Sequence, residues 1–191
     1  MKAFSKVTSR AIPMWLSDVD TDMIIPAQYL TQITKSGYGE YLFARLKEKE
    51  GFVFNQSCYK GAKILLSGAN FGCGSSREHA VWALQQAGIK VIIAPSFSDI
   101  FFNNAAKNGL LLVELDSKSI ESFVIQAEKD NLEITVNLEN LEVIVDGKVY
   151  PFQYDPFRRE CLLKGQGDLE YLLAQESCIS NYENNKQKVV I

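Results

Sequence analysis

Three short apolar runs, separated by stretches of helix-forming residues, dominate the middle of the chain. The runs AKILLS, IKVIIA and LLLVEL occupy residues 62–67, 89–94 and 110–115, with the length and composition of buried strands. Helix-like stretches lie between them at residues 76–87 and 98–107. This alternation predicts a βαβαβ unit with a parallel sheet, in which right-handed crossovers place both helices on one side unless the strand order reverses. Ligands bind such sheets at the carboxyl ends of the strands.

The loop that leaves the first apolar run has the sequence GANFGCGSSREHA, over residues 68–80. Ser75 and Glu78 have the S-x-x-E spacing of a capping box, which predicts Ser75 as the N-cap of the first helix. Gly88 supplies a C-terminal stop after residue 87. The loop therefore ends at a predicted helix N-terminus, where backbone N–H groups and the helix dipole favour an anion.

Two glycines and an arginine make this loop a candidate anion site. Gly72 and Gly74 can adopt backbone angles closed to other residues, and so can expose N–H groups to a ligand. Arg77 adds a planar guanidinium suited to a carboxylate or a phosphate. An ordinary tight turn, a capped helix and a solvated Arg77 explain the same residues, and physics alone favours neither interpretation.

Nucleotide-binding and nucleophile motifs fit the loop poorly. A P-loop needs Gly-Lys-Ser/Thr where residues 74–76 are Gly-Ser-Ser, and a nucleophile elbow needs glycines at the positions of Cys73 and Arg77. The only histidine, His79, follows Ser75 by four residues on the predicted helix, whose side chains point back toward its N-terminus. We expect a packed, hydrogen-bonded histidine under the loop rather than a Ser/His/Asp triad.

Composition narrows the possible partners and compartment. The 191 residues are 47% hydrophobic with a net charge of −3 and no basic run, which argues for one domain and against nucleic acid or an anionic membrane as partner. No apolar stretch approaches the ~20 residues of a membrane span, and MKAFSKVTSR lacks a signal-peptide core, so we expect a cytoplasmic protein. The cysteines are far apart without a CxxC pair, which predicts reduced thiols and neither a metal nor a cofactor bound by this chain; they are Cys58, Cys73, Cys161 and Cys178.

Outside the central core, three further features are predicted. Residues 38–49 have the apolar spacing of one amphipathic helix. Asp146-Gly147 is a hairpin turn signal between strands at 141–145 and 148–152, with a third strand possible at 132–136. Asp155-Pro156 then begins a helix that ends at Gly165.

The string NFGCGSSREHA resembles the signature of the aconitase-superfamily swivelling domain, in the form found in bacterial 3-isopropylmalate dehydratase small subunits. The segments at 18–30, 58–84, 88–111 and 155–165 resemble that family in the same order. The resemblance implies an α/β, aconitase-like swivelling domain with β/β/α layers, a parallel βαβαβ core, an added β-hairpin and C-terminal helices. We expect residues 1–191 to form a single domain, with 155–181 as a helical extension and 182–191 as a mobile tail.

The resemblance also implies a function and a partner. The family interconverts 2- and 3-isopropylmalate by loss and return of water in leucine biosynthesis. A large partner subunit carries the [4Fe–4S] cluster that grips the hydroxyl and carboxylate of this small dicarboxylate, and the swivelling domain supplies the base. Ser75 matches that base, and Arg77 matches the residue that binds substrate carboxylate and supports the charged base. Substrate contacts are implied at Thr21, Asp22, Tyr29, Leu30, Lys35, Gly74 and Ser76.

Two departures from the family pattern stand out. Lys35 occupies the place of an arginine in an Arg-Thr-Gly-Phe/Tyr-Gly stretch, so any bidentate contact there is lost. The segment GQGDLEYLL at 165–173 has Glu170 and Tyr171 where glycine and leucine are usual. Two other functions stay open: the small subunit of a related hydro-lyase, such as homoaconitase or citraconate/methylmalate hydratase, and a non-catalytic anion-binding module.

Overall fold

A seven-stranded mixed sheet organises the chain, and the computed structural model describes residues 1–30, 35–130 and 132–187. The strand order is β4-β3-β2-β1-β5-β6-β7, parallel from β4 to β1 and antiparallel from β1 to β7. The strands are β1 (Lys6–Met14), β2 (Ile64–Ser67), β3 (Val91–Ala94), β4 (Leu111–Glu114), β5 (Glu133–Asn137), β6 (Glu142–Val145) and β7 (Lys148–Pro151). The predicted parallel core is confirmed. The central strand β1 lies outside the predicted βαβαβ unit.

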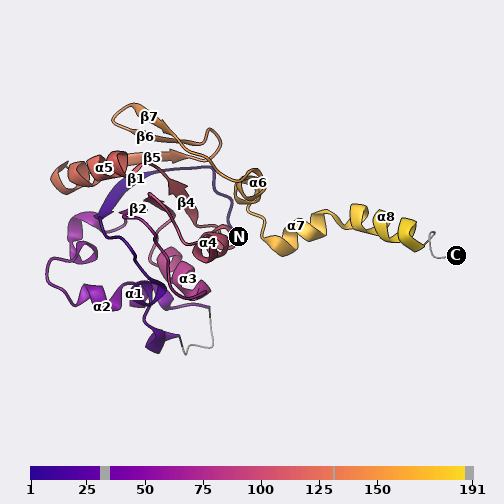
Figure 1. Cartoon of the computed structure of the whole chain (residues 1–191), viewed down its shortest axis with the longest axis horizontal. Helices are drawn as coiled ribbons and strands as arrows, with labels where there is room; N and C mark the ends of the chain where they lie inside the picture. The colour runs from indigo at the N-terminus through magenta and orange to yellow at the C-terminus, as the bar shows by residue number, and fades with distance from the viewer. Residues whose placement is uncertain (31–34, 131, 188–191) are drawn as a thin grey trace.

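Helices cover both faces of the parallel half of the sheet (Figure 1). Helices α3 (Glu78–Gln86) and α4 (Asp99–Asn108) lie on one face, where Leu65 packs in one buried cluster with Ala80 and Phe101. Helix α5 (Ser117–Asp130) covers the other face, where Ile64 packs in a second cluster with Ile120. Neighbouring residues of β2 thus serve opposite cores, as the two-residue period of a strand requires.

The single helix predicted for residues 38–49 is wrong. The structure has a short 3-10 helix η2 (Tyr38–Tyr41), a break, and the short helix α2 (Ala44–Lys47). Phe43 makes the break: its φ is 52°, its N–H donates to the Ile24 carbonyl at 2.8 Å, and its ring is buried. Burial of the ring and this backbone hydrogen bond outweigh the strain of the left-handed conformation. Because Phe43 keeps that conformation, residues 38–49 cannot form a continuous helix.

The predicted hairpin at Asp146-Gly147 and the predicted ends of the helix that follows Asp155 are confirmed. Asp146 and Gly147 both have positive φ, at 48° and 76°, as a two-residue hairpin between β6 and β7 requires. Helix α6 (Pro156–Lys164) begins after Asp155, whose carboxylate accepts a hydrogen bond from the Arg158 N–H, and it ends at Gly165 in the left-handed region.

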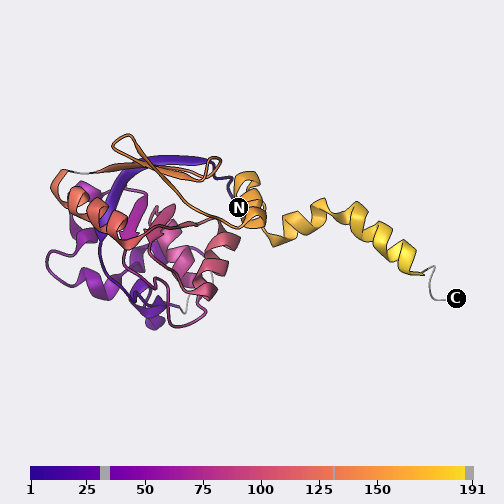
Figure 2. The same cartoon turned by 45° about the horizontal axis from the view of Figure 1, so that its top comes forward.

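Two further helices, α7 (Asp168–Ala174) and α8 (Glu176–Gln187), extend away from the sheet as an arm (Figures 1 and 2). The expected boundary between a helical extension and a tail at 181/182 falls inside α8, and residues 188–191 lie outside the described residues. Over the ranges that the structure describes, no helix is long and apolar enough to cross a membrane.

Three loops meet at the edge formed by the carboxyl ends of β1, β2 and β3. Isolated parallel bridges join Asp20 to Cys73 and Phe71 to Phe97, so the three loops continue the strand order beyond the sheet. This edge, predicted to bind ligands, contains the motif at residues 68–80.

Candidate functional site

The loop between β2 and α3 is fixed by backbone bonds and by one close approach. The Gly72 N–H donates to the Val19 carbonyl at 2.7 Å, which ties this loop to the one after β1. Gly72 has a φ of 80°, and a Cβ atom there would lie 2.2 Å from the Phe101 ring. Only glycine fits both the backbone angle and the space, so the loop is held against α4.

The predicted capping box is wrong. Helix α3 begins at Glu78 with Arg77 as its N-cap residue, and no side-chain capping bond is made there. The Glu78 carboxylate instead accepts a hydrogen bond from the Asn108 side-chain amide at 2.7 Å. Because Ser75 lies before the helix and does not cap it, its hydroxyl is available for another role.

Ser75 forms a pair with Thr21, a residue from the loop after β1. The two hydroxyl oxygens are 3.0 Å apart, and the Ser75 N–H donates to Thr21 Oγ1 at 3.2 Å. Thr21 is only 2% exposed, whereas Ser75 is exposed. Thr21 begins the short helix α1 (Thr21–Ile24), which Asp20 caps, and its own N–H donates to the Cys73 carbonyl at 2.9 Å. The buried threonine therefore supports the exposed serine from behind.

Asp22 lies between two arginines. The Arg77 Nη1 donates to Asp22 Oδ1 at 2.9 Å, the Ala27 N–H donates to the same oxygen at 3.0 Å, and the Arg45 Nη1 donates to Oδ2. The hydrogen bond from Arg77, then that from Ala27, and the positive charge of Arg45 hold the pKa of Asp22 below its ordinary value. Asp22 is therefore ionised at neutral pH. Arg45 lies in the segment predicted as one amphipathic helix, and no motif there marks it as a site residue.

Gly74 and Ser76 flank Ser75 on the exposed edge. Gly74 has a φ of 91°, a conformation that side chains rarely adopt. The Ser76 carbonyl accepts a weak hydrogen bond from the Asn104 side-chain amide at 3.4 Å. The thiol of Cys73, just before them, has a raised pKa, because it is partly buried and lies near the carboxylates of Asp20 and Asp18. This thiol therefore stays protonated at neutral pH.

The remaining candidates make contacts of other kinds. Tyr29, in the 3-10 helix η1 (Ala27–Tyr29), stacks on Tyr41 with ring centroids 4.2 Å apart, and both Tyr29 and Leu30 pack against the core. The Lys35 ammonium lies over the Trp82 ring, 4.8 Å from its centre. The structure therefore forms two neighbouring hydrogen-bonded pairs, Thr21 with Ser75 and Asp22 with Arg77. Tyr29 and Leu30 help to anchor their loop to the core, and the Lys35 ammonium faces the Trp82 ring.

The packing expected for His79 is observed, among aromatic rings, while its expected hydrogen bond stays a prediction. Its ring meets Tyr38 edge-on at 5.2 Å and Trp82 at 4.7 Å. These contacts fix the first turn of α3 below the loop rather than directing His79 toward Ser75.

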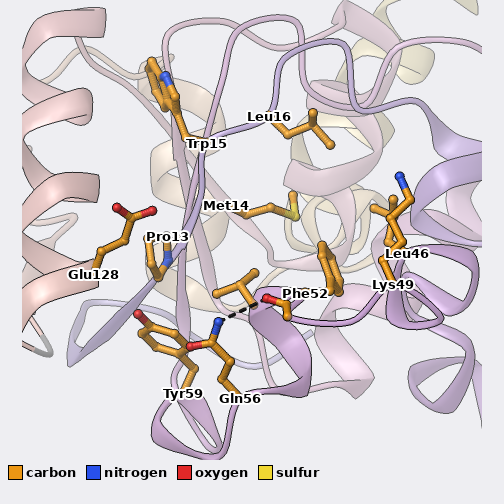
Figure 3. Close-up of a pocket in the computed structure, with 12 residues that line it drawn as sticks. Pro13, Met14, Trp15, Leu16, Leu46, Lys49, Phe52, Gln56, Tyr59 and Glu128 are labelled. Carbon is orange, nitrogen blue, oxygen red and sulfur yellow. Dashed lines mark hydrogen bonds between the residues drawn. The ribbon is translucent and has the colours of Figure 1, made fainter.

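A hollow of about 530 Å³ lies elsewhere, between the end of β1 and the segment that follows α2 (Figure 3). Met14, Leu16 and Phe52 give it an apolar side, while Gln56 and Glu128 are polar groups on its wall. None of the residues proposed for chemistry lines this hollow. Ser75 is instead exposed and Arg77 half-buried at the loop edge.

Metal-ligating side chains are not gathered within the described part of the chain. Cys58, Cys73, Cys161 and Cys178 are free thiols, and among the described residues no three His, Cys, Asp or Glu side chains are placed to hold a metal ion. The donor set therefore does not fit an iron–sulfur cluster.

Comparisons with known proteins agree with this fold and motif. The family model "Aconitase C-terminal domain" matches residues 1–118. The 3-isopropylmalate dehydratase small subunit of Francisella philomiragia is 58% identical over 188 residues, which cover 98% of this chain and 100% of the relative. The protein of the same name from Rhodospirillum centenum is 47% identical, covering 96% and 94%. The crystal structure of 3-isopropylmalate dehydratase from Methanocaldococcus jannaschii matches with a TM-score of 0.70 at 31% identity, over 93% of this chain and 99% of that one.

Proposed function

Because the chain belongs to the family of 3-isopropylmalate dehydratase small subunits, we propose that its loop edge supplies the base and a carboxylate-binding arginine of that enzyme. The chain is a hydro-lyase subunit that acts with a large subunit and interconverts 2- and 3-isopropylmalate by loss and return of water. The observation that carries the proposal for the site is the Ser75–Thr21 pair beside Arg77, at an open edge.

Ser75 is the proposed base. Loss of water removes a proton from one carbon and hydroxide from its neighbour, leaving an alkene, and water returns with the two positions exchanged. A serine takes a proton from carbon only if its alkoxide is stabilised by donors. Thr21 Oγ1 accepts from the Ser75 N–H, so its own O–H is free to donate to Ser75 Oγ, 3.0 Å away. This bond supports a role for Thr21 in holding the base rather than in touching substrate.

Arg77 is the proposed ligand of a substrate carboxylate. Its bond to Asp22 uses Nη1, and its side chain is 26% exposed. A guanidinium has five N–H donors, so the rest of the fork is available to a carboxylate. Asp22 orients the guanidinium, and Gly74 and Ser76, exposed beside Ser75, are further proposed substrate contacts.

The [4Fe–4S] cluster is assigned by this proposal to the large subunit. The support is the donor set of this chain, whose four cysteines do not converge. The open position of Ser75 supports the same division of labour, because a base on an exposed edge needs a second surface to exclude water. A cytoplasmic location, and the absence of nucleic-acid and membrane partners, remain predictions.

The test is Ser75→Ala in the complex reconstituted with a large subunit from the same family. We expect turnover to fall by ~10² or more, the contribution of a positioned acid–base group, with subunit association unchanged. Ser76→Ala is the matched comparison, since it removes the neighbouring hydroxyl, and it should raise KM more than it lowers kcat. A Ser75→Ala complex with unchanged turnover would remove the proposed base.

A further inference from the structure

Asp22 is shared between two arginines in an arrangement that leaves one of them free to bind substrate. A carboxylate facing a single guanidinium normally closes on it with both oxygens in a bidentate pair. Here Oδ1 takes Nη1 of Arg77 and the Ala27 N–H, while Oδ2 takes Nη1 of Arg45. Arg77 therefore gives Asp22 one donor of its fork, and Arg45 occupies the oxygen that would take a second.

We propose that Arg45 is a positioning residue that keeps Arg77 open for a substrate carboxylate by holding the second oxygen of Asp22. The inference rests on the proposed function, in which Arg77 binds that carboxylate. Without Arg45, Oδ2 is free to turn toward Arg77 and to take the donors that substrate requires. Arg45 then affects substrate binding without contacting substrate.

The backbone places Arg45 for this task. Helix α2 lies beside α1, which carries Asp22 (Figure 1). The left-handed residue Phe43 sets the start of α2; its ring packs on Phe52 and Phe54, at 6.0 and 4.9 Å, and its N–H bonds to the end of α1. Strain of this kind persists only where the surroundings fix it, and here it directs Arg45 toward Asp22.

A purely stabilising role explains Arg45 less well. Its side chain is 57% exposed, and an ion pair with that much solvent contributes little to folding. Lys35 does not compete for Asp22, since its ammonium lies over Trp82. Arg45 is therefore the second cation on Asp22, and the proposal predicts its effect in binding rather than in stability.

The experiment measures kcat and KM for 3-isopropylmalate in the reconstituted complex. Arg45→Ala should raise KM by roughly 10- to 100-fold, the effect of losing one charged hydrogen bond to substrate, with kcat within about twofold of the parent. Arg45→Lys should restore part of the KM, because an ammonium still holds one carboxylate oxygen. Lys49→Ala is the matched control: it removes a cation four residues away, exposed beside α2, and should change neither constant.

A double-mutant cycle with Asp22→Asn tests the route of the effect. If Arg45 acts through Asp22, the double variant has the same KM as Asp22→Asn alone. Additive effects on KM would mean that Arg45 binds substrate itself and would overturn the inference. An unchanged KM in Arg45→Ala would also overturn it. So would a variant in which kcat and thermal stability both fall, because that result indicates a structural role for Arg45.

Arg77→Ala separates this inference from the function on which it rests. If Arg77→Ala leaves KM unchanged, the proposed role of Arg77 fails. If Arg77→Ala raises KM and Arg45→Ala does not, the inference about Arg45 fails alone.

Discussion

Thr21→Val removes one buried hydroxyl from behind Ser75 and nearly preserves the side-chain shape. The change deletes the hydroxyl that lies 3.0 Å from Ser75 Oγ, which is the proposed donor to it, and the acceptor of the Ser75 N–H at 3.2 Å. Other contacts of Thr21, including its N–H bond to the Cys73 carbonyl, use the backbone and remain. The variant therefore tests whether this hydroxyl stabilises the charged form of the base.

The expected magnitudes for activity and stability differ. One preorganised donor to a developing oxyanion accounts for roughly 10²–10³ in kcat. The kcat of the Thr21→Val complex should therefore fall by that factor. Its stability should change by no more than about 1 kcal/mol, because a lost hydrogen bond of ~1 kcal/mol is offset by a buried methyl group of similar size. Thr21→Ser keeps the hydroxyl and loses a methyl from a side chain that is 2% exposed. It should cost about 1 kcal/mol of stability with kcat nearly unchanged.

Two measurements decide the matter. Initial rates of dehydration by the reconstituted complex follow from alkene absorbance, and urea unfolding of the subunit gives the stability change. The two variants should rank in opposite orders, with valine lower in activity and serine lower in stability. A valine variant within threefold of parental kcat, or a serine variant as inactive as valine, would refute the proposed support of the base.

Three other changes test neighbouring features of the loop edge. Arg77→Lys keeps the charge and loses the planar fork, so kcat/KM should fall by roughly 10-fold or more while urea unfolding stays near parental; equal kinetics would contradict carboxylate binding by a fork. Gly72→Ala combines positive φ with a clash against an aromatic ring from α4 and should lose about 2–5 kcal/mol in urea unfolding. Gly88→Ala, with a φ of 98° and open space around its Cβ, is the control that carries strain alone, and a loss as large as that of Gly72→Ala would remove the role of the clash. Tyr29→Ala and Leu30→Ala should reduce the preference for isopropylmalate over citramalate by roughly 10- to 200-fold at most, measured as the ratio of kcat/KM values; an unchanged ratio would place this specificity on the large subunit.

Local chemistry explains which parts of the fold were predictable. The hairpin at Asp146-Gly147 and the ends of α6 depend on residues that fit only a few backbone angles, and both predictions are confirmed. Strand β1 gave no comparable signal. Its first half is polar and half-buried against β5, its second half is fully buried, and its partners come from distant parts of the chain. No single hydrophobic period describes such a strand.

Some residues of the candidate site were likewise predictable from the sequence, and others were not. The motif suggested Ser75 and Arg77, and the resemblance suggested Thr21 and Asp22, which the structure places in contact with them. The capping prediction failed because the Ser75 hydroxyl is engaged by a residue 54 positions earlier, which no local rule detects. Arg45 was missed because its position depends on a left-handed break in the preceding segment. That break results from tertiary burial rather than from residue preference.

The central position of β1 also affects how an incompletely synthesised chain behaves. The β1 ladder with β2 spans about 50 residues of sequence, and its other ladder, with β5, pairs Lys6 with Asn137. Contacts so distant in sequence form slowly, because the intervening chain must first be brought together. A nascent or truncated chain that ends before β5 therefore exposes the free backbone groups of Lys6–Arg10 as an open strand edge. Such an edge recruits strands from other molecules, so self-association of incomplete chains is a consequence of the same strand that positions Thr21.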